Sequence, residues 1–285
     1  MAVIMDGKAL SMKLKNSLKE EVEKIISEGV NPCLAVIIVG DNPASKVYVN
    51  NKKKSCAELG IKSLEYALPE ETTEEELLKI IDELNKNEDV DGILCQLPLP
   101  RHITEKNVIN SILPEKDVDA FHPENVGHIM IGDYAFLPCT PAGVMEILKE
   151  YEIDVAGKNC VVVGRSNIVG KPMTMLLLKE NATVTVCHSK TKDLASFTKN
   201  ADILVSAVGK PGLITADMVK ENAVVIDVAI NRLENGKLCG DVDFENVKDK
   251  TSFITPVPGG VGPMTIATLM KNTVTSAKNR LEKTK

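Results

Sequence analysis

Aromatic side chains are scarce in this sequence: they make up 3% of its 285 residues, and tryptophan is absent. The hydrophobic core must therefore be built mainly from valine, isoleucine, leucine and methionine. No apolar run approaches the roughly 20 residues that a membrane-spanning helix needs, and the N-terminal segment lacks the apolar stretch of a signal peptide. We therefore expect a cytoplasmic protein with no membrane partner.

Paired cysteine motifs are also missing. The seven cysteines are scattered, and none lies in a Cys-x-x-Cys pattern. Their odd number argues against a disulfide framework and against a structural zinc site, so we expect no metal centre. We interpret Cys33, Cys95 and Cys160 as small buried hydrophobes. The formal net charge of −6, without a basic stripe of interleaved aromatics, argues against nucleic acid as a partner.

The first part of the chain alternates strand-like and helix-like segments. Leu10, Leu14 and Leu18 recur at helical spacing, and Thr73 with Glu76 forms a helix-starting capping box. We expect helices at residues 10–29, from the turn at 41–45 to about 60, at 73–85 and at 104–112, and strands at 34–39, 63–68 and 92–96. Such alternation is typical of a parallel sheet covered by helices.

A second alternating series begins near residue 140, with predicted strands at 160–163, 183–187, 202–208 and 223–228. Residues 119–141 lack clear periodicity and hold several prolines and glycines, so we interpret them as the crossing between two domains. An amphipathic pattern at 263–283 predicts a last helix that packs back on the first domain. We therefore expect an α/β protein with one domain at 1–121 plus helix 266–285, and a second, Rossmann-like domain at 122–265.

Residues 159–172, NCVVVGRSNIVGKP, join a β-branched strand through a glycine turn to a helix start. Gly164 permits a sharp turn and Gly170 close packing, so the N–H groups of the helix start could hold a phosphate. The spacing departs from Gly-x-Gly-x-x-Gly. The segment by itself therefore fits a nucleotide-phosphate loop and an ordinary glycine turn about equally well.

The strand that follows this turn favours a particular nucleotide. It leads into His188-Ser189-Lys190-Thr191-Lys192, at the place where an NAD site usually has an acidic residue for the ribose 2′-hydroxyl. Hydroxyl and basic groups there, together with Arg165 in the loop, suit the 2′-phosphate of NADP instead. Lys190 and Lys192 also fit a solvated turn. The pattern as a whole favours NADP as the cofactor.

Polar side chains also follow strands of the first domain, where ligands of open α/β sheets bind. Tyr48 and Lys52 are four residues apart and share one helix face. Gln96 ends a strand beside a proline-stiffened loop and could orient a neighbouring group. Asp119 could bind the guanidine-like edge of a heterocycle, but spacing does not separate it from its rival Asp117. Each side chain also has an ordinary explanation as a solvated lysine, an edge cap or a turn cap.

Residues 255–265, TPVPGGVGPMT, contain three prolines and three glycines and lead directly into an apolar helix. Linkers are usually flexible or polar. We therefore interpret this segment as a rigid, shaped loop with exposed backbone.

In this order, the segments closely resemble the bifunctional methylenetetrahydrofolate dehydrogenase/cyclohydrolase family. The resemblance covers nearly the whole chain and rests on VGDNPASKVYVNNK (39–52), GILCQLPLP (92–100), PEKDVDAFHPENVG (114–127), PCTPAG (138–143), VVVGRSNIVGKP (161–172), SAVGKPG (206–212), GDVDF (240–244) and TPVPGGVGPMT (255–265). It implies two α/β domains with a cleft between them, usually in a homodimer. It further implies NADP-dependent oxidation of 5,10-methylenetetrahydrofolate to 5,10-methenyltetrahydrofolate, then hydrolysis to 10-formyltetrahydrofolate, within one-carbon metabolism and purine biosynthesis.

The resemblance also implies residue roles. Lys52 matches the family's catalytic lysine and Gln96 its partner. Tyr48 matches the tyrosine that stacks on folate, and Asp119 the aspartate that binds the pterin edge. Further substrate-binding positions are Leu97, Pro98, Pro258, Gly259 and Gly260, and cofactor-binding positions are Gly164, Arg165, Ser166, Ser189 and Ile230. The first domain would then bind folate and carry the catalytic residues, and the second would bind NADP.

Two alanines depart from the family's pattern. Ala120 and Ala229 stand where glycine is expected in DVDGFH and VIDVGIN, and each adds one methyl group. Ala229 precedes Ile230, a cofactor-binding position. Of the two departures, the one at 229 therefore bears more directly on how the cofactor fits. Two other functions stay open at this point: an NADP-dependent dehydrogenase of a small hydroxy or keto acid, such as a shikimate-type enzyme, and a non-catalytic folate- or nucleotide-binding protein.

Overall fold

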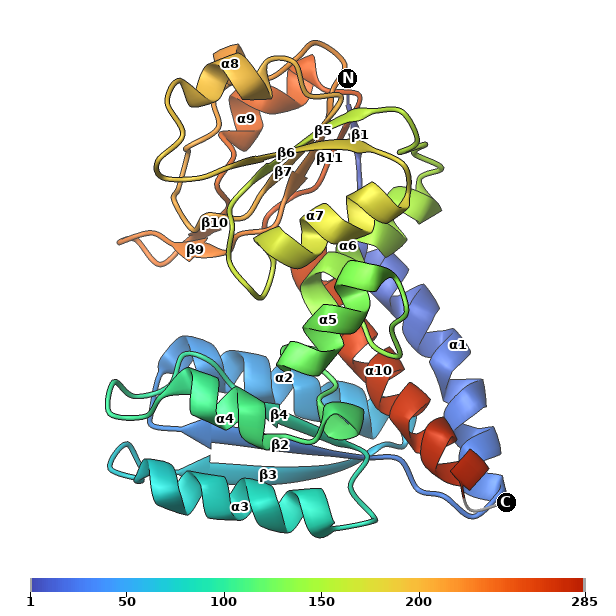
Figure 1. The fold of residues 1–285 in the computed structure, drawn as a ribbon. Coiled ribbons are helices and arrows are strands. Elements are labelled where there is room, and N and C mark those ends of the chain that lie inside the picture. The colour runs from blue at the N-terminus through green and yellow to red at the C-terminus, as the bar shows by residue number, and fades with distance from the viewer. Residues whose placement is uncertain (1, 284–285) are drawn as a thin grey trace. The chain divides into compact units, whose positions relative to one another are not determined.

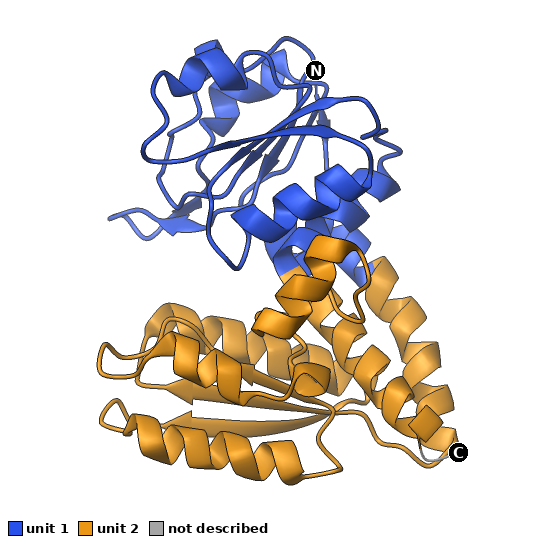
Figure 2. Ribbon diagram, in the orientation of Figure 1, with its two compact units in different colours: residues 1–12, 140–265 blue, residues 13–139, 266–285 orange. Residues whose placement is uncertain are grey.

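The computed structural model describes residues 2–283, and the chain divides into two compact units (Figure 2). Unit 1 comprises the residues up to Met12 together with Thr140–Thr265. Unit 2 comprises Lys13–Cys139 together with the residues from Ile266 onward. Two long helices, α1 (Gly7–Ser27) and α10 (Val261–Lys283), contribute residues to both units.

Unit 2 is built on a three-stranded parallel sheet in the order β3-β2-β4 (Figure 1). Its elements are β2 (Cys33–Val39), α2 (Pro43–Leu59), β3 (Lys62–Leu68), α3 (Glu74–Lys86), β4 (Gly92–Cys95), α4 (Glu105–Ser111), a 3₁₀ turn (Pro114–Lys116) and α5 (Pro123–Ile131). All seven residues of β2 are buried, as the centre of a sheet covered on both faces requires.

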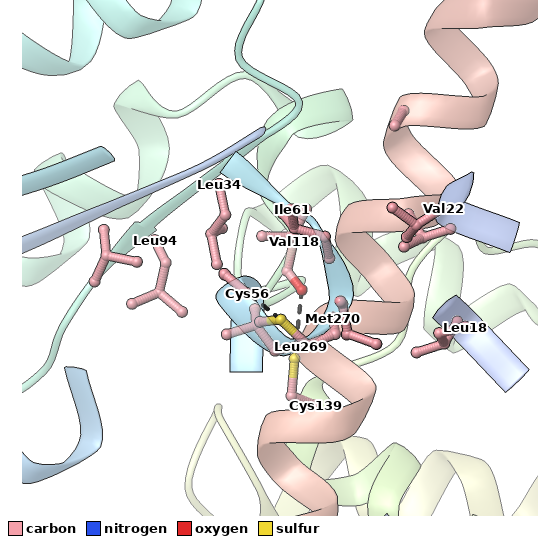
Figure 3. Packing of buried hydrophobic residues seen from close by; sticks show 14 of the residues in the cluster. Leu18, Val22, Leu34, Cys56, Ile61, Leu94, Val118, Cys139, Leu269 and Met270 are labelled. Atoms are coloured by element: carbon pink, nitrogen blue, oxygen red, sulfur yellow. Dashed lines mark hydrogen bonds between the residues drawn. The ribbon is translucent and has the colours of Figure 1, made fainter. Parts of the chain in front are cut away.

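The side chains of β2 alternate between two hydrophobic clusters. Leu34, Val36 and Ile38 pack with residues of α1, α2 and α10, whereas Cys33 and Ile37 pack with residues of α3 and α4. Figure 3 shows the first cluster, in which the Cys56 thiol contacts the Met270 sulfur at 3.6 Å. Helix α10 is therefore part of the core of unit 2.

Unit 1 contains a six-stranded parallel sheet in the order β1-β11-β8-β7-β5-β6. Its elements are β1 (Val3–Ile4), α6 (Cys139–Glu150), β5 (Asn159–Val163), α7 (Gly170–Lys179), β6 (Thr183–Cys187), α8 (Leu194–Thr198), β7 (Ile203–Ser206), β8 (Val224–Asp227), α9 (Phe244–Val247) and β11 (Phe253–Ile254). A two-stranded ribbon is formed by β9 (Asn231–Arg232) and β10 (Leu238–Cys239), and 3₁₀ turns lie at Ala216–Met218 and Lys248–Lys250.

The order of strands in unit 1 reverses at β5. The chain passes from β5 to β6 on one side, then returns to β7 on the other side of β5. Loops on opposite sides of such a reversal part at the carboxyl ends of the strands and leave the crevice where nucleotides bind. The predicted α/β class with parallel sheets and a Rossmann-like second sheet is confirmed.

The units differ from the expected domain division at two places. Val3 and Ile4 pair with β11, which places the first residues in unit 1. The division between the units also falls at 139/140 rather than 121/122, because the Asn272 amide of α10 donates to the carbonyls of Val118 and Leu137. The expected grouping of the C-terminal helix with the first domain agrees with unit 2 from Ile266 onward.

The division between the units falls inside the predicted crossing at 119–141, but this stretch is not irregular throughout, because it contains α5 and the start of α6. Pro123 occupies the first turn of α5, the His122 ring accepts the N–H of Glu124, and Gly132 ends the helix with φ +79°. Proline at the start of a helix and glycine just beyond its end are favourable positions. Separately, no helix within residues 2–283 combines the length and apolar character needed to cross a bilayer.

Candidate active site

Lys52 is a buried amine at the carboxyl edge of the sheet in unit 2. It lies on α2, only 7% of its surface is exposed, and its Nζ donates to Gln96 Oε1 at 2.9 Å. The Gln96 side-chain amide donates to the Leu97 carbonyl at 2.7 Å, and its backbone N–H donates to Ile37 of β2. Both contacts fix Gln96, so its carbonyl oxygen is held ready for the lysine.

Start and end signals in the sequence fix the helix that carries Lys52. The Asn42 side chain accepts the N–H groups of Ala44 and Ser45, and Gly60 ends α2 with φ +75°. Tyr48 is one turn before Lys52 and is half-buried. Burial raises the pKa of its phenol, so Tyr48 is a neutral ring near neutral pH.

The surroundings of Lys52 favour the neutral amine. Burial lowers the pKa of Lys52, while Asp119 and then the thiols of Cys139, Cys56 and Cys95 act in the opposite direction. A neutral amine has a lone pair and can accept a proton. The neighbouring Lys53 is exposed and pairs with Glu65 at 3.0 Å, as expected for a solvent lysine.

The structure separates the two rival carboxylates. Asp117 is 3% exposed, and its Oδ2 accepts the His122 N–H at 2.7 Å and the Asn125 amide at 2.9 Å. Burial raises the pKa of Asp117 to about 6. Asp119 is half-buried and acts electrostatically on Lys52. Asp117 thus organises the turn, and Asp119 is the carboxylate beside the lysine.

Other predicted positions in unit 2 surround this centre. Asp119 and Leu97 line a small pocket with Ile93, Cys95 and Phe121. Leu97 is half-buried and Pro98 is exposed, and the peptide bond between them is cis. The structure therefore brings Lys52, Gln96, Leu97 and Asp119 into one region of unit 2.

The glycine turn after β5 is the second site-like feature, and it lies in unit 1. A Cβ atom at Gly164 would lie 2.4 Å from the Ala207 carbonyl oxygen, and one at Gly170 would lie 2.3 Å from the Gly164 carbonyl oxygen. Only glycine fits both positions. Ser166 is exposed, and its Oγ accepts the N–H groups of Val169 and Gly170 at the start of α7.

The remaining predicted cofactor positions lie at the same edge of the sheet. Arg165 is exposed beside Gly164, Ser189 is exposed just after β6, and Ile230 is 38% exposed in the loop after β8. Hydroxyl and guanidinium groups therefore face solvent after β5 and β6. This donor set fits a phosphate-bearing nucleotide at the reversal of strand order.

The proline- and glycine-rich loop is held firmly within unit 1. The Gly260 N–H donates to the Pro256 carbonyl at 2.9 Å, and the Lys8 N–H donates to the Gly259 carbonyl at 3.0 Å. A Cβ atom at Gly260 would lie 2.6 Å from the Pro256 carbonyl oxygen. Pro258 and Gly259 keep exposed surface. These three loop positions belong to unit 1, and Tyr48, Lys52, Gln96 and Asp119 belong to unit 2.

The two alanine departures differ in their backbone. Ala120 is fully buried with φ +58°, in the left-handed region that glycine adopts without strain. Ala229 is half-buried, and its φ is not positive. Alanine at 229 therefore costs no backbone strain.

Both units match one protein family. Residues 5–119 match its tetrahydrofolate dehydrogenase/cyclohydrolase catalytic domain, and residues 138–281 match its NAD(P)-binding domain. The chain belongs to the tetrahydrofolate dehydrogenase/cyclohydrolase family. The resemblance inferred from the sequence motifs is thereby confirmed.

Individual members of this family are similar over nearly the full chain. The bifunctional protein FolD of Acetivibrio thermocellus is 65% identical over 277 residues, which cover 97% of each chain. The crystal structure of the FolD dehydrogenase/cyclohydrolase of Campylobacter jejuni is 58% identical, has a TM-score of 0.97, and the match covers 98% of this chain and 100% of that one. The dehydrogenase-cyclohydrolase of Trypanosoma brucei, complexed with NADP and an inhibitor, is 40% identical with a TM-score of 0.95 and 98% coverage of each chain.

The sequence patterns did not indicate two sets of buried side chains near these sites. The Cys139 thiol is buried, acts electrostatically on Lys52, and donates to the Val118 carbonyl. The sequence motif PCTPAG had suggested no role for this cysteine. Asp241 and Asp227 are buried carboxylates in unit 1, and the backbone N–H of Asp241 donates to Asp227 Oδ1. An aspartate between apolar residues, as in Gly240-Asp241-Val242, was the available signal for the second set. Within residues 2–283, no cluster of three or more His, Cys, Asp or Glu side chains is arranged to hold a metal ion.

Proposed function

We propose that this protein oxidises 5,10-methylenetetrahydrofolate with NADP and then hydrolyses the 5,10-methenyl product to 10-formyltetrahydrofolate. The observation that carries the proposal is the buried, pKa-lowered Lys52 held by Gln96 beside Asp119. Membership of the family through both of its domains supports two activities in one chain. The relative from Acetivibrio thermocellus is itself named a bifunctional protein.

In the oxidation, the chain's own residues bind and align the reactants. NADP, when bound, supplies the acceptor for a hydride from the methylene carbon that bridges N5 and N10. Gly164 lets the backbone approach a phosphate, and Arg165, Ser166 and Ser189 offer the donors that a 2′-phosphate needs. Ile230 offers apolar surface at the same edge. The folate nitrogens stabilise the cation, so this step depends on alignment more than on proton transfer.

The hydrolysis needs a base. Water attacks the bridging methenyl carbon, and the neutral Lys52 amine accepts a proton from that water as the new C–O bond forms. The bond from this carbon to N5 then breaks as N5 takes the proton back from the lysine, and the new hydroxyl releases its proton to solvent to become the formyl C=O. Gln96 keeps the amine in place, and Asp119 is proposed to bind the pterin edge while Tyr48 stacks on it. Leu97, Pro98 and the loop at 258–260 are proposed to contact the folate.

We further propose that the protein is a homodimer. Within residues 2–283, strand β3 pairs with β2 alone, so its other edge is unpaired. Exposed strand edges are usually covered by another element or a second chain. Light scattering after size exclusion tests this point, and a monomeric mass at micromolar concentration contradicts it.

A cytoplasmic location is the remaining part of the proposal. The seven cysteines are free thiols, and five of them are buried. Free thiols are typical of proteins in a reducing compartment. Cell fractionation with a cytoplasmic marker enzyme checks this location.

One absorbance assay tests the proposed function. Purified protein is mixed with 5,10-methylenetetrahydrofolate and NADP, and the spectra of NADPH and the methenyl product are followed together. The proposal expects both to form and the methenyl signal then to decay, with NAD a poorer acceptor than NADP. No turnover would point to a binding protein, and NADP reduction only with a hydroxy acid such as shikimate would point to the other dehydrogenase class.

A further inference from the structure

Asp241 is a completely buried carboxylate in unit 1 that gathers five donors. Its Oδ2 accepts the Ser206 hydroxyl at 3.0 Å and the N–H groups of Val208 and Gly209 at 2.8 and 3.3 Å. Its Oδ1 accepts the N–H of Lys210 at 2.7 Å and the Asn231 amide at 3.2 Å. A buried charge is stable only when donors surround it in this way.

Four of these donors lie in two segments, one after β7 and one after β8, at the nucleotide edge of the sheet. Residues 208–210 begin the loop after β7, and the Ala207 carbonyl lies against the Gly164 turn, where a Cβ atom would approach it to 2.4 Å. Strand β7, which precedes residues 208–210, lies next to β5, where strand order reverses. Asn231 directly follows Ile230 and is the first residue of β9. One carboxylate therefore ties together the segments after β7 and after β8, which lie on the β7 side of the crevice.

The shape of the first loop depends on this carboxylate. Three successive N–H groups converge on it, an arrangement that encloses an anion, and Gly209 permits it with φ +78°. Without a negative acceptor, the three N–H groups would repel one another at the centre of the turn, and the loop would open.

Asp241 is itself held by the strands beneath it. Asp227 at the end of β8 accepts the backbone N–H of Asp241 at 3.0 Å and that of Val242 at 2.8 Å. The Asp227 N–H donates to the Thr255 hydroxyl at 2.8 Å. Gly240 has to be glycine, since a Cβ atom there would lie 1.9 Å from Asp227 Oδ2. The position of Asp241 is thus set by the sheet, and the loops take their position from Asp241.

We propose that Asp241 is a positioning residue for NADP, which acts through the 208–210 loop and Asn231 without touching the cofactor. The proposal rests on the proposed function, since it assumes that NADP lies in the crevice between the loops after β5 and β7. It assigns the carboxylate charge, rather than the volume of the side chain, as the feature that shapes the cofactor site.

The test is Asp241→Asn, because asparagine keeps the volume and removes the charge. An asparagine oxygen at the Oδ2 position leaves an NH₂ group facing the Lys210 N–H, so one wall of the crevice should shift. Loss of a charge-assisted hydrogen bond predicts that the Kd and KM for NADP rise about tenfold or more. Hydrolysis of methenyltetrahydrofolate, assayed without NADP, should change by less than about twofold, because Lys52 lies in unit 2.

Asp243→Asn is the matched control. It makes the same chemical change two residues away, where the carboxylate accepts only from the Asn246 side chain of α9 among the contacts resolved. It should leave the Kd for NADP unchanged. Ser206→Ala removes one of the five donors to Asp241. The loss of one neutral hydrogen bond should raise the Kd for NADP about threefold.

The outcomes separate this inference from the proposed function. A wild-type protein without NADP-dependent oxidation contradicts the proposed function, whatever the variants do. An active wild type with an unchanged NADP Kd in Asp241→Asn overturns the positioning role alone. If Asp241→Asn loses both activities through unfolding, Ser206→Ala decides, and an unchanged Kd in that variant overturns the role.

Discussion

The Lys52 amine donates to the Gln96 side-chain oxygen at 2.9 Å, while the Gln96 amide is occupied by the Leu97 carbonyl. This arrangement holds the lysine through a neutral acceptor. A carboxylate in the same place would stabilise the ammonium form. The glutamine therefore keeps Lys52 available as a neutral base.

Gln96→Glu should move the pH dependence of hydrolysis. A negative partner raises the pKa of Lys52, so a smaller fraction of the amine is neutral at pH 7, and each pKa unit costs about tenfold in rate. The hydrolysis rate of the wild type should rise with pH as Lys52 loses its proton, and in Gln96→Glu this rise should lie at higher pH. Rate profiles over pH check this, and an unshifted profile would argue against Lys52 as the base.

Asp117 and Asp119 should respond differently to alanine. Asp117→Ala leaves the His122 N–H and the Asn125 amide without their acceptor, which should lower the free energy of unfolding by about 1–3 kcal/mol. Asp119→Ala should leave unfolding by urea nearly unchanged and raise the KM for the folate substrate. A reversed pattern would show that the two roles have been exchanged.

Ala120→Gly should change stability by less than about 1 kcal/mol. Glycine at φ +58° relieves roughly 1–2 kcal/mol of left-handed strain. Against this stand the greater freedom of glycine in the unfolded chain, about 0.5–1 kcal/mol, and the loss of a buried methyl, about 0.8 kcal/mol. Urea denaturation checks the balance, and a loss above about 2 kcal/mol would show that the methyl is a tightly packed core group.

Asp227 should titrate near neutral pH. Burial, the largest cause, raises its pKa to about 7, and Asp241 adds to the rise, while the N–H groups of Asp241 and Val242 oppose it. In the unfolded chain the value is about 3.9. The folded state therefore binds the proton more tightly, so this group's contribution to stability is full below about pH 4 and is lost as the pH rises to about 7. A ¹³C-carboxyl NMR titration measures it directly, and a midpoint below about pH 5 would refute the assignment.

The sequence predicted the parts of the fold that depend on local signals. The capping box of Thr73 and Glu76 starts α3, and the β-branched run before Gly164 forms β5. It did not predict β1 or β11, because two-residue strands have no period of their own and form only by pairing across the chain. Spacing also failed to separate Asp117 from Asp119, and only the family resemblance favoured Asp119. Their physical difference comes from His122 and Asn125, which the fold brings to Asp117.

The candidate site followed a similar division. The spacing of Tyr48 and Lys52 was sufficient to place both on one helix, and the glycine turn was sufficient to predict close backbone approach at Gly164. The apolar neighbours of Asp241 indicate burial, but its contact with Asp227 was not predictable, because the strand pairing and loop folding that join these residues leave no spacing pattern in the sequence. In both units, the contacts that the sequence could not predict are those between residues far apart in the chain.

Lys52→Met, assayed with 5,10-methylenetetrahydrofolate and NADP, is the most direct measurement of the central claim. Methionine keeps most of the volume of the side chain and removes the amine. NADPH and the methenyl product should still form at a measurable rate, and the methenyl product should accumulate, because the base for its hydrolysis is gone. Lys53→Met, which alters an exposed lysine paired with Glu65, should keep both activities. Decay of the methenyl product at the wild-type rate in Lys52→Met would contradict the account.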